Sequence, residues 1–171
     1  YYQVDRSRRK QVIKELLGEE FKGTLISDFY SVYLKLPYDM QKCLVHVLRD
    51  FHTSAKTDKS QEFVAARKKI KRIIKDAVRL QSRHETLPKG KYECLRVRIE
   101  ERLFDFMAFG YKNKNLQRLS KRFAQSWMDM LRFHKDPSLG WQFKSKQITA
   151  GANGYSGNLA GVIDEVRIYP K

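Results

Sequence analysis

The pattern of hydrophobic and polar residues changes twice along the chain, near residues 56 and 138. Up to residue 55, short apolar runs alternate with polar breaks, which is typical of proteins that alternate strands and helices. Over residues 56–137, apolar residues recur at the 3.6-residue period of amphipathic helices. Residues 138–171 are rich in glycine and end in a β-rich segment. We therefore expect an α/β region, a helical region and a short β-rich tail.

The first region predicts strands and helices in alternation. Residues 1–4 are expected to form a strand, and the helix that follows can be capped by Ser7 and ended by Gly18. Its apolar stripe comprises Val12, Ile13, Leu16 and Leu17. A second strand is expected over residues 23–28 and a short helix over residues 29–36.

The next apolar run, from Cys43 to Leu48, is open to two interpretations. With Met40 it predicts either a buried strand over residues 40–48 or a strand that continues into a helix. In the first case two buried strands would deliver polar residues at their carboxyl ends, where ligands collect in open α/β sheets. In either case the order of elements favours a parallel sheet with right-handed crossovers.

Three consecutive helices are expected in the second region. They run from Phe63 to Leu80, from Tyr92 to Phe106 and from Leu116 to Leu131, and Pro88 separates the first two. Several aromatic residues here could stack on nucleic-acid bases, although their helical spacing makes a core position the commoner role. These residues are Phe104, Phe106, Phe109, Phe123 and Trp127.

Composition adds a strong basic bias to this picture. The 171 residues carry a formal net charge of +16, and residues 51–139 hold 22 lysines and arginines against 10 acidic residues. Such a charge points to a polyanionic partner, with nucleic acid ahead of an acidic membrane surface. No apolar run approaches the length of a membrane span or a signal peptide. Because the chain has only two cysteines, a disulfide framework is unlikely, and a reducing compartment is the default expectation.

The first long helix concentrates this charge. Six of its cations are candidates for contact with a DNA backbone, where each neutralised phosphate adds salt-sensitive affinity. They are Arg67, Lys68, Lys71, Arg72, Lys75 and Arg79. The alternative is a solvated helix face, the usual role of a run of charges.

Two further groups have candidate chemistry. Asp28 follows the second expected strand, so it is either a metal-binding carboxylate or an ordinary aspartate that caps the next helix. Cys43 and His46 have the spacing of half a zinc site, but no second pair with ligand spacing follows, so zinc binding is not expected.

A longer pattern around Asp28 resembles a known enzyme family. The residues that carry it are Ser7-Arg8, Leu16-Leu17-Gly18, Gly23, Ser27-Asp28-Phe29-Tyr30, Tyr33, Gln41, Cys43, His46, Arg49 and Asp50. In order and spacing they are similar to the insertion sequence 66 family of DDE transposases, over about residues 1–137.

The resemblance implies a fold and a chemistry. The fold would be α/β, with a partial ribonuclease H-like core and an incomplete sheet over residues 1–55, and with the family's basic helical insertion over 56–137. In such enzymes three carboxylates bind two Mg²⁺ ions that stabilise the attacking and leaving oxygens during cleavage of a phosphodiester. Asp28 matches the second of these acids. His46 and Arg49 would lie beside the active site and approach DNA phosphate, whereas Cys43 would be buried.

The other two acids of the family pattern are missing. The first would precede Tyr1, and the third would follow Pro137, where the chain has no glutamate until Glu165. We therefore expect a truncated transposase-like protein, inactive alone, whose ancestral chemistry is DNA cleavage and strand transfer. The alternative is a non-catalytic basic protein that binds nucleic acid. Transposon-end DNA would be the partner, and the chain could form a homo-oligomer. The resemblance implies a bacterial cytoplasmic, nucleoid-associated location and no membrane partner.

The tail has a separate resemblance. The segment from Leu159 to Tyr169 is similar to the last strand of laminin G-like, concanavalin A-like lectin domains. A sandwich of that kind needs many more strands than residues 138–171 can supply, so the tail would be a fragment. Carbohydrate binding through it is the weakest of the functional interpretations, and Glu165 belongs to this strand rather than to a metal site.

Overall fold

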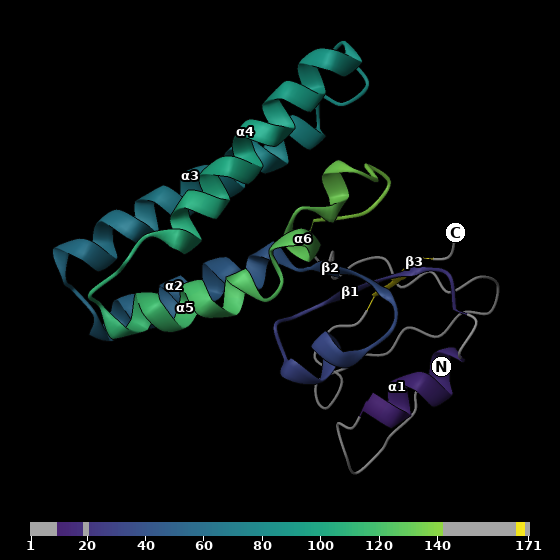
Figure 1. Cartoon of the computed structure of the whole chain (residues 1–171), viewed down its shortest axis with the longest axis horizontal. Helices are drawn as coiled ribbons and strands as arrows, with labels where there is room; N and C mark the ends of the chain where they lie inside the picture. The colour runs from purple at the N-terminus through teal and green to yellow at the C-terminus, as the bar shows by residue number, and fades with distance from the viewer. Residues whose placement is uncertain (1–9, 19–20, 142–166, 170–171) are drawn as a thin grey trace.

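The computed structural model describes residues 10–18, 21–141 and 167–169, and within them a small sheet joins an elongated block of helices (Figure 1). Figure 1 shows the two longest helices, α3 and α4, side by side, with α2 and α5 beneath them. The sheet lies to the right of α2 and α5 in this view. The predicted strand over residues 1–4 lies outside the described residues. Among the described helices, none combines the length and apolar composition that crossing a membrane requires.

The sheet has three short strands in the order β2-β1-β3. Strands β1 (Thr24–Ser27) and β2 (Asp39–Lys42) are parallel, which confirms the expected parallel pairing at this point. Strand β3 (Arg167–Tyr169) pairs antiparallel with the other side of β1. All four residues of the central strand β1 are buried, the polar Thr24 and Ser27 as well as the apolar Leu25 and Ile26.

Short elements around the sheet match the expected pattern. Helix α1 (Lys10–Leu17) ends at Gly18, whose φ of 76° lies in the left-handed region that glycine adopts without a Cβ clash. The expected helix over residues 29–36 is a single 3-10 turn, η1 (Ser31–Lys35). A small apolar cluster joins α1, η1 and the sheet, and includes Leu17, Leu25, Tyr33, Leu36, Tyr38 and Met40.

The second apolar run belongs to a helix. Of the two alternatives, the strand that continues into a helix is confirmed, because β2 ends at Lys42 and α2 spans Leu44–Thr57. The hypothesis of two long buried strands is wrong for this run. The segment forms a helix because the fully buried Leu44, Val47 and Phe51 are spaced three and four residues apart, which puts all three on one helical face against the main core.

The helical region contains the expected helices with one break. Helix α3 spans Gln61–Gln81, α4 spans Lys89–Ala108 and α5 spans Lys114–Ala124. The third expected helix stops at α5, and a four-residue helix, α6 (Trp127–Met130), and a 3-10 turn, η2 (Arg132–His134), follow it.

Aromatic side chains form much of the core between these helices. Phe51 of α2 lies with its ring centroid 5.7 Å from that of Phe63, 6.1 Å from that of Phe106 and 6.2 Å from that of Phe123, so it joins four helices. Phe106 and Phe123 are fully buried, as their spacing predicts. The core role is wrong for two others, Phe104 and Phe109, which are more than half exposed. Trp127 is partly buried.

A polar cluster ties together the loops at one end of the block. The carboxylate of Asp58 accepts hydrogen bonds from the side-chain amides of Asn113 (2.7 Å) and Asn115 (2.9 Å). Glu62 accepts the backbone N–H groups of Lys112 (3.0 Å) and Asn113 (2.8 Å). The α2–α3 and α4–α5 loops are therefore held at a fixed distance, which also fixes the start of α3 relative to α2.

Candidate functional site

The carboxyl ends of the two parallel strands meet at one edge of the sheet. Ser27 ends β1 and Lys42 ends β2, and the two residues are register partners. Asp28 directly follows Ser27, and Cys43 follows Lys42 with its N–H donating to the carbonyl of Ser27 at 2.8 Å. This edge is where ligands and catalytic groups collect in α/β sheets.

Asp28 has a turn-forming role at this edge. It is half-buried, and its Oδ1 accepts the backbone N–H of Tyr30 at 2.8 Å, which orients the chain into η1. This hydrogen bond forms a local turn ahead of η1. The N-cap residue of η1 is Tyr30 and no side chain caps the helix, so the capping role predicted as the alternative to metal binding is not confirmed. One carboxylate oxygen is occupied by this bond.

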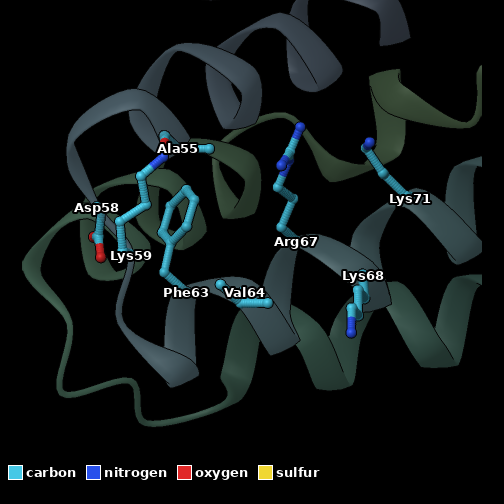
Figure 2. Close-up of a pocket in the computed structure, with 8 residues that line it drawn as sticks. All are labelled: Ala55, Asp58, Lys59, Phe63, Val64, Arg67, Lys68 and Lys71. Atoms are coloured by element: carbon cyan, nitrogen blue, oxygen red, sulfur yellow. Dashed lines mark hydrogen bonds between the residues drawn. The ribbon is translucent and has the colours of Figure 1, made fainter.

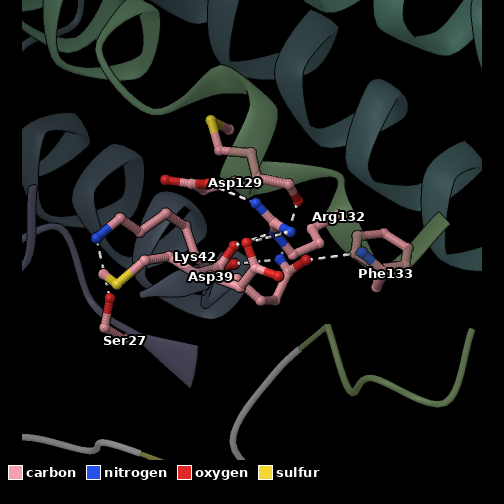
Figure 3. Close-up of polar contacts among 9 residues, drawn as sticks. Ser27, Asp39, Lys42, Asp129, Arg132 and Phe133 are labelled. Carbon is pink, nitrogen blue, oxygen red and sulfur yellow. Dashed lines mark hydrogen bonds and ion pairs between the residues drawn. The ribbon is translucent and has the colours of Figure 1, made fainter. Parts of the chain in front are cut away.

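Lys42 places a buried cation beside Asp28. Its side chain is fully buried, and Nζ donates to Ser27 Oγ at 2.9 Å (Figure 3). Nζ also donates to the main-chain carbonyl of Asp28 at 3.0 Å. The same ammonium lies 6.0 Å from the ring centroid of Phe29 and 5.6 Å from that of Tyr33. Two hydrogen bonds and two aromatic faces compensate part of the lost hydration.

Burial and nearby carboxylates oppose each other at Lys42. Burial, the larger effect, lowers the pKa of Lys42 to about 8, while the Asp129 and Asp28 carboxylates act to raise it. Burial likewise raises the pKa of Asp129, against the attraction of Lys42 and Arg132. The edge therefore holds a lysine whose proton is released far more easily than that of a surface lysine.

An arginine connects this edge to the helical block. Arg132 forms ion pairs with Asp39 (3.0 Å) and Asp129 (3.7 Å), and its Nε donates to the carbonyl of Met40 at 2.8 Å (Figure 3). One guanidinium thus joins η2 and α6 to strand β2.

Gln41 makes a second, buried connection. Its amide Nε2 donates to the carbonyl of Met130 at 3.0 Å, and its Oε1 accepts the N–H of Phe133 at 2.8 Å. Because both partners lie about 90 residues further along the chain, the strand end and the α6–η2 segment form one unit.

His46 and Arg49 lie on the helix that starts at this edge. Both belong to the first half of α2, and Arg49 Nη1 lies 3.4 Å from His46 Nε2. Arg49 is exposed. Their contact with DNA phosphate stays a prediction, whereas Cys43 is buried as expected.

The described residues do not form a cluster of metal-ligating side chains. Within residues 10–18, 21–141 and 167–169, no three histidine, cysteine, aspartate or glutamate side chains gather closely enough to hold a metal ion. Asp28 therefore has no described pair of acidic partners, and its nearest charged neighbour on β2 is the Lys42 ammonium. The donor set that a pair of Mg²⁺ ions requires is not assembled from the described residues.

The six predicted DNA-binding cations of α3 all lie away from its core face. Lys68, Arg72, Lys75 and Arg79 are exposed and follow one another at intervals of four, three and four residues, so they form one stripe. Lys71 is exposed and Arg67 is half-buried, both on the side toward α2. We call these six residues the basic face of α3.

None of the six cations forms an ion pair with any described residue. Elsewhere the described arginines are often neutralised. The pairs are Arg96 with Glu93 and Glu100, Arg102 with Asp76, Arg122 with Asp50, and Arg132 with Asp39 and Asp129. The basic face of α3 is therefore a concentration of uncompensated positive charge on a rigid helix.

Lys42 is the residue that sequence reasoning missed. Its partners come from β1 and α6, and no local pattern announces a buried lysine. The sequence feature that could have indicated Lys42 is its position at the end of a short strand, between Gln41 and Cys43, which both belong to the pattern that resembles the transposase family.

Comparison with known proteins identifies the family. The family model described as "Transposase IS66 family" matches residues 1–141, while no curated protein and no solved structure matches the chain. The match ends before most of the tail, whose resemblance to a lectin strand stays a prediction. Since the matched segment covers most of the 171 residues, this chain belongs to the IS66 family of transposases.

Proposed function

We propose that the chain binds DNA along the basic face of α3 as its part in transposition. The observation that carries this proposal is the set of six cations without acidic partners among the described residues. Such a surface attracts the phosphate backbone and releases counterions when DNA binds. Transposon ends are the proposed target, which would place the protein on chromosomal DNA in a bacterial cytoplasm.

The dimensions of the stripe suit a duplex. From Lys68 to Arg79 the helix rises by about 16 Å, at about 1.5 Å per residue. A B-DNA major groove is about 12 Å wide. Cations at the two ends of the stripe can therefore reach phosphates on opposite sides of one groove.

Cleavage is a separate part of the proposal. The family resemblance predicts a ribonuclease H-like core in which Asp28 is one of three Mg²⁺-binding acids, and Mg²⁺ would supply charge stabilisation at the scissile phosphate. Asp28 is the one acid of that set among the described residues. Lys42 lies beside it, and one carboxylate oxygen of Asp28 accepts a hydrogen bond from the Tyr30 N–H. We therefore propose that the chain binds DNA without cutting it.

Gel shifts and a nicking assay on the same protein test both parts. Labelled transposon-end duplex should be retarded at low salt, with affinity falling steeply as salt rises, and should stay intact with Mg²⁺ or Mn²⁺. Absence of binding at low salt would contradict the DNA-binding proposal. Metal-dependent nicking that Asp28→Asn abolishes would show that the chain is active and that its acids assemble.

The alternative of a non-catalytic nucleic-acid-binding protein is favoured by the same sheet edge, where Asp28 lies beside the Lys42 ammonium and belongs to no group of described side chains that could hold a metal ion. If Asp28→Asn leaves DNA affinity unchanged and no nicking appears with either metal, the edge is structural and the chain acts through its basic helix alone.

A further inference from the structure

A hollow of about 290 Å³ lies where the end of α2 meets the first half of α3 (Figure 2). This volume is at the lower end for sites that take small ligands, so the hollow suits one residue-sized group rather than a duplex. Its lining residues are Ala55, Asp58, Lys59, Phe63, Val64, Arg67, Lys68 and Lys71.

The lining combines an apolar part with cations. Val64, which is 41% exposed, and Ala55 provide apolar surface, and the fully buried Phe63 lies beneath them. The single acid of the lining is Asp58, whose carboxylate already accepts hydrogen bonds from two asparagine amides and from Ser60. Lys59 already donates to the carbonyl of Ala55, so an occupant would meet chiefly the cations Arg67 and Lys71 and little competing negative charge.

Arg67 offers an unused hydrogen bond in this hollow. Its Nε is buried and has no hydrogen-bond partner among the described residues. Figure 2 shows Arg67 and Lys71, one turn apart on α3, extending in the same direction, while Lys68 extends the other way. A buried N–H without an acceptor is costly, and an anion between Arg67 and Lys71 would satisfy it with a charge-assisted bond.

We propose that the hollow holds one unpaired nucleotide of a DNA strand, with its base against Val64 and Ala55 and its phosphate on Arg67 and Lys71. The proposal rests on DNA binding by the basic face, to which Arg67 and Lys71 also belong. An acidic peptide would match the charge as well. Continuity with that face favours DNA, because Arg67, Lys68 and Lys71 belong both to the basic face and to the lining of the hollow.

The test compares DNA probes that differ in one nucleotide. Fluorescence anisotropy of the whole chain is measured with a fully paired duplex and with the same duplex carrying one unpaired nucleotide. We expect about tenfold tighter binding of the second probe, because its unpaired base buries apolar surface against Val64 and Ala55.

Two matched pairs of variants locate the preference. Val64→Glu places a carboxylate in the hollow, whereas Ala65→Glu makes the same charge change at the next, exposed position, which does not line it. Val64→Glu should abolish the tenfold preference and Ala65→Glu should keep it. Likewise Arg67→Gln should reduce the preference, whereas Arg72→Gln should weaken binding of both probes equally.

The outcomes separate this inference from the proposed function. Equal affinity of the wild-type chain for both probes, or a preference that Val64→Glu leaves intact, overturns the nucleotide site while duplex binding stands. Loss of binding to both probes at low salt contradicts the proposed function itself. If an acidic peptide binds instead and Val64→Glu abolishes that binding, the hollow is a protein-docking site and the nucleotide proposal is wrong.

Discussion

Lys42 keeps its ammonium group at the sheet edge through interactions with two parts of the chain, the end of β1 and helix α6. Ser27 and Asp28 accept its hydrogen bonds, and Asp129 supplies the strongest opposing charge. Its burial nevertheless dominates and depresses its pKa. Such a residue could not be predicted from sequence, because a strand-end lysine reads as solvent-exposed until the α6 segment covers it.

Lys42→Met tests this burial through pH. The pKa of Lys42 is 10.5 in the unfolded chain and about 8 in the folded protein. The unfolded state therefore binds more protons between these values, and wild-type stability should gain about 3 kcal/mol as pH rises from 8 to 10.5. Lys42→Met should lack this gain, whereas Lys69→Met, at an exposed position, should keep it.

Urea unfolding at pH 7.5 and at pH 10 measures the difference between the proteins. Burial also raises the pKa of Tyr111 to about 12, which opposes the gain near the top of the range, but this effect is common to all three proteins. Parallel pH dependences for wild type and Lys42→Met would show that the lysine is not desolvated.

The turn-forming role of Asp28 can be tested with substitutions that keep or remove the oxygen that accepts the Tyr30 N–H. Asp28→Asn retains an oxygen for the Tyr30 N–H, so the free energy of unfolding should change by less than about 0.5 kcal/mol. Asp28→Ala removes it and should cost about 1 kcal/mol. Thermal or urea unfolding checks both values, and an equal loss in the two variants would mean that charge rather than turn formation matters.

At the scale of elements, sequence periodicity predicted the long helices well because their core residues lie three or four positions apart. The run after Lys42 was ambiguous, since six residues that are apolar except for His46 suit a buried strand as well as a helix. Packing of Val47 and Phe51 against the helical block decides for the helix. Phe104 was misjudged because it lies two residues from the buried Phe106, so one helix cannot bury both.

The loop cluster at the end of the block makes a prediction about helix capping. Asn113 Oδ1 caps α5 by accepting the N–H of Leu116 at 3.1 Å, and its amide donates to Asp58 and Ser60. Asn113→Ala removes all three bonds and should cost about 1–2 kcal/mol. Asn115→Ala removes one bond to Asp58 and should cost clearly less. Urea unfolding compares them, and a larger loss for Asn115→Ala would contradict this account of the cluster.

The same cluster should respond to acid. Hydrogen bonds from Asn115 and Asn113, the largest causes, lower the pKa of Asp58 from 3.8 to about 2. A depressed carboxyl pKa gives stability above pH 4 that is lost as pH falls toward 2. Asp58→Asn should therefore flatten the acid limb of the stability curve between pH 4 and 2. An unchanged acid limb in thermal unfolding would show that Asp58 titrates normally.

At the scale of the whole molecule, two connected parts have different roles in this account. The sheet edge is closed by ion pairs and buried amides that join β2 to α6 and η2. The helical block presents its unpaired cations outward on α3. The sequence pattern around Asp28 predicted the family, and charge counting predicted the basic helix. Neither could show which arginines are neutralised by ion pairs, because Arg102 and Arg122 pair with acids far away in the sequence.

The central claim, DNA binding through the basic face of α3, is tested most directly by the salt dependence of binding. The dissociation constant for a duplex is measured against salt for the wild type, for Lys68→Gln/Lys75→Gln/Arg79→Gln, and for the exposed α5 set Lys114→Gln/Arg118→Gln/Lys121→Gln. Each lost phosphate contact lowers the log–log slope by about 0.9. The account predicts a slope shallower by about 3 for the α3 variant and little change for the α5 variant. Equal slopes for the two variants would contradict it.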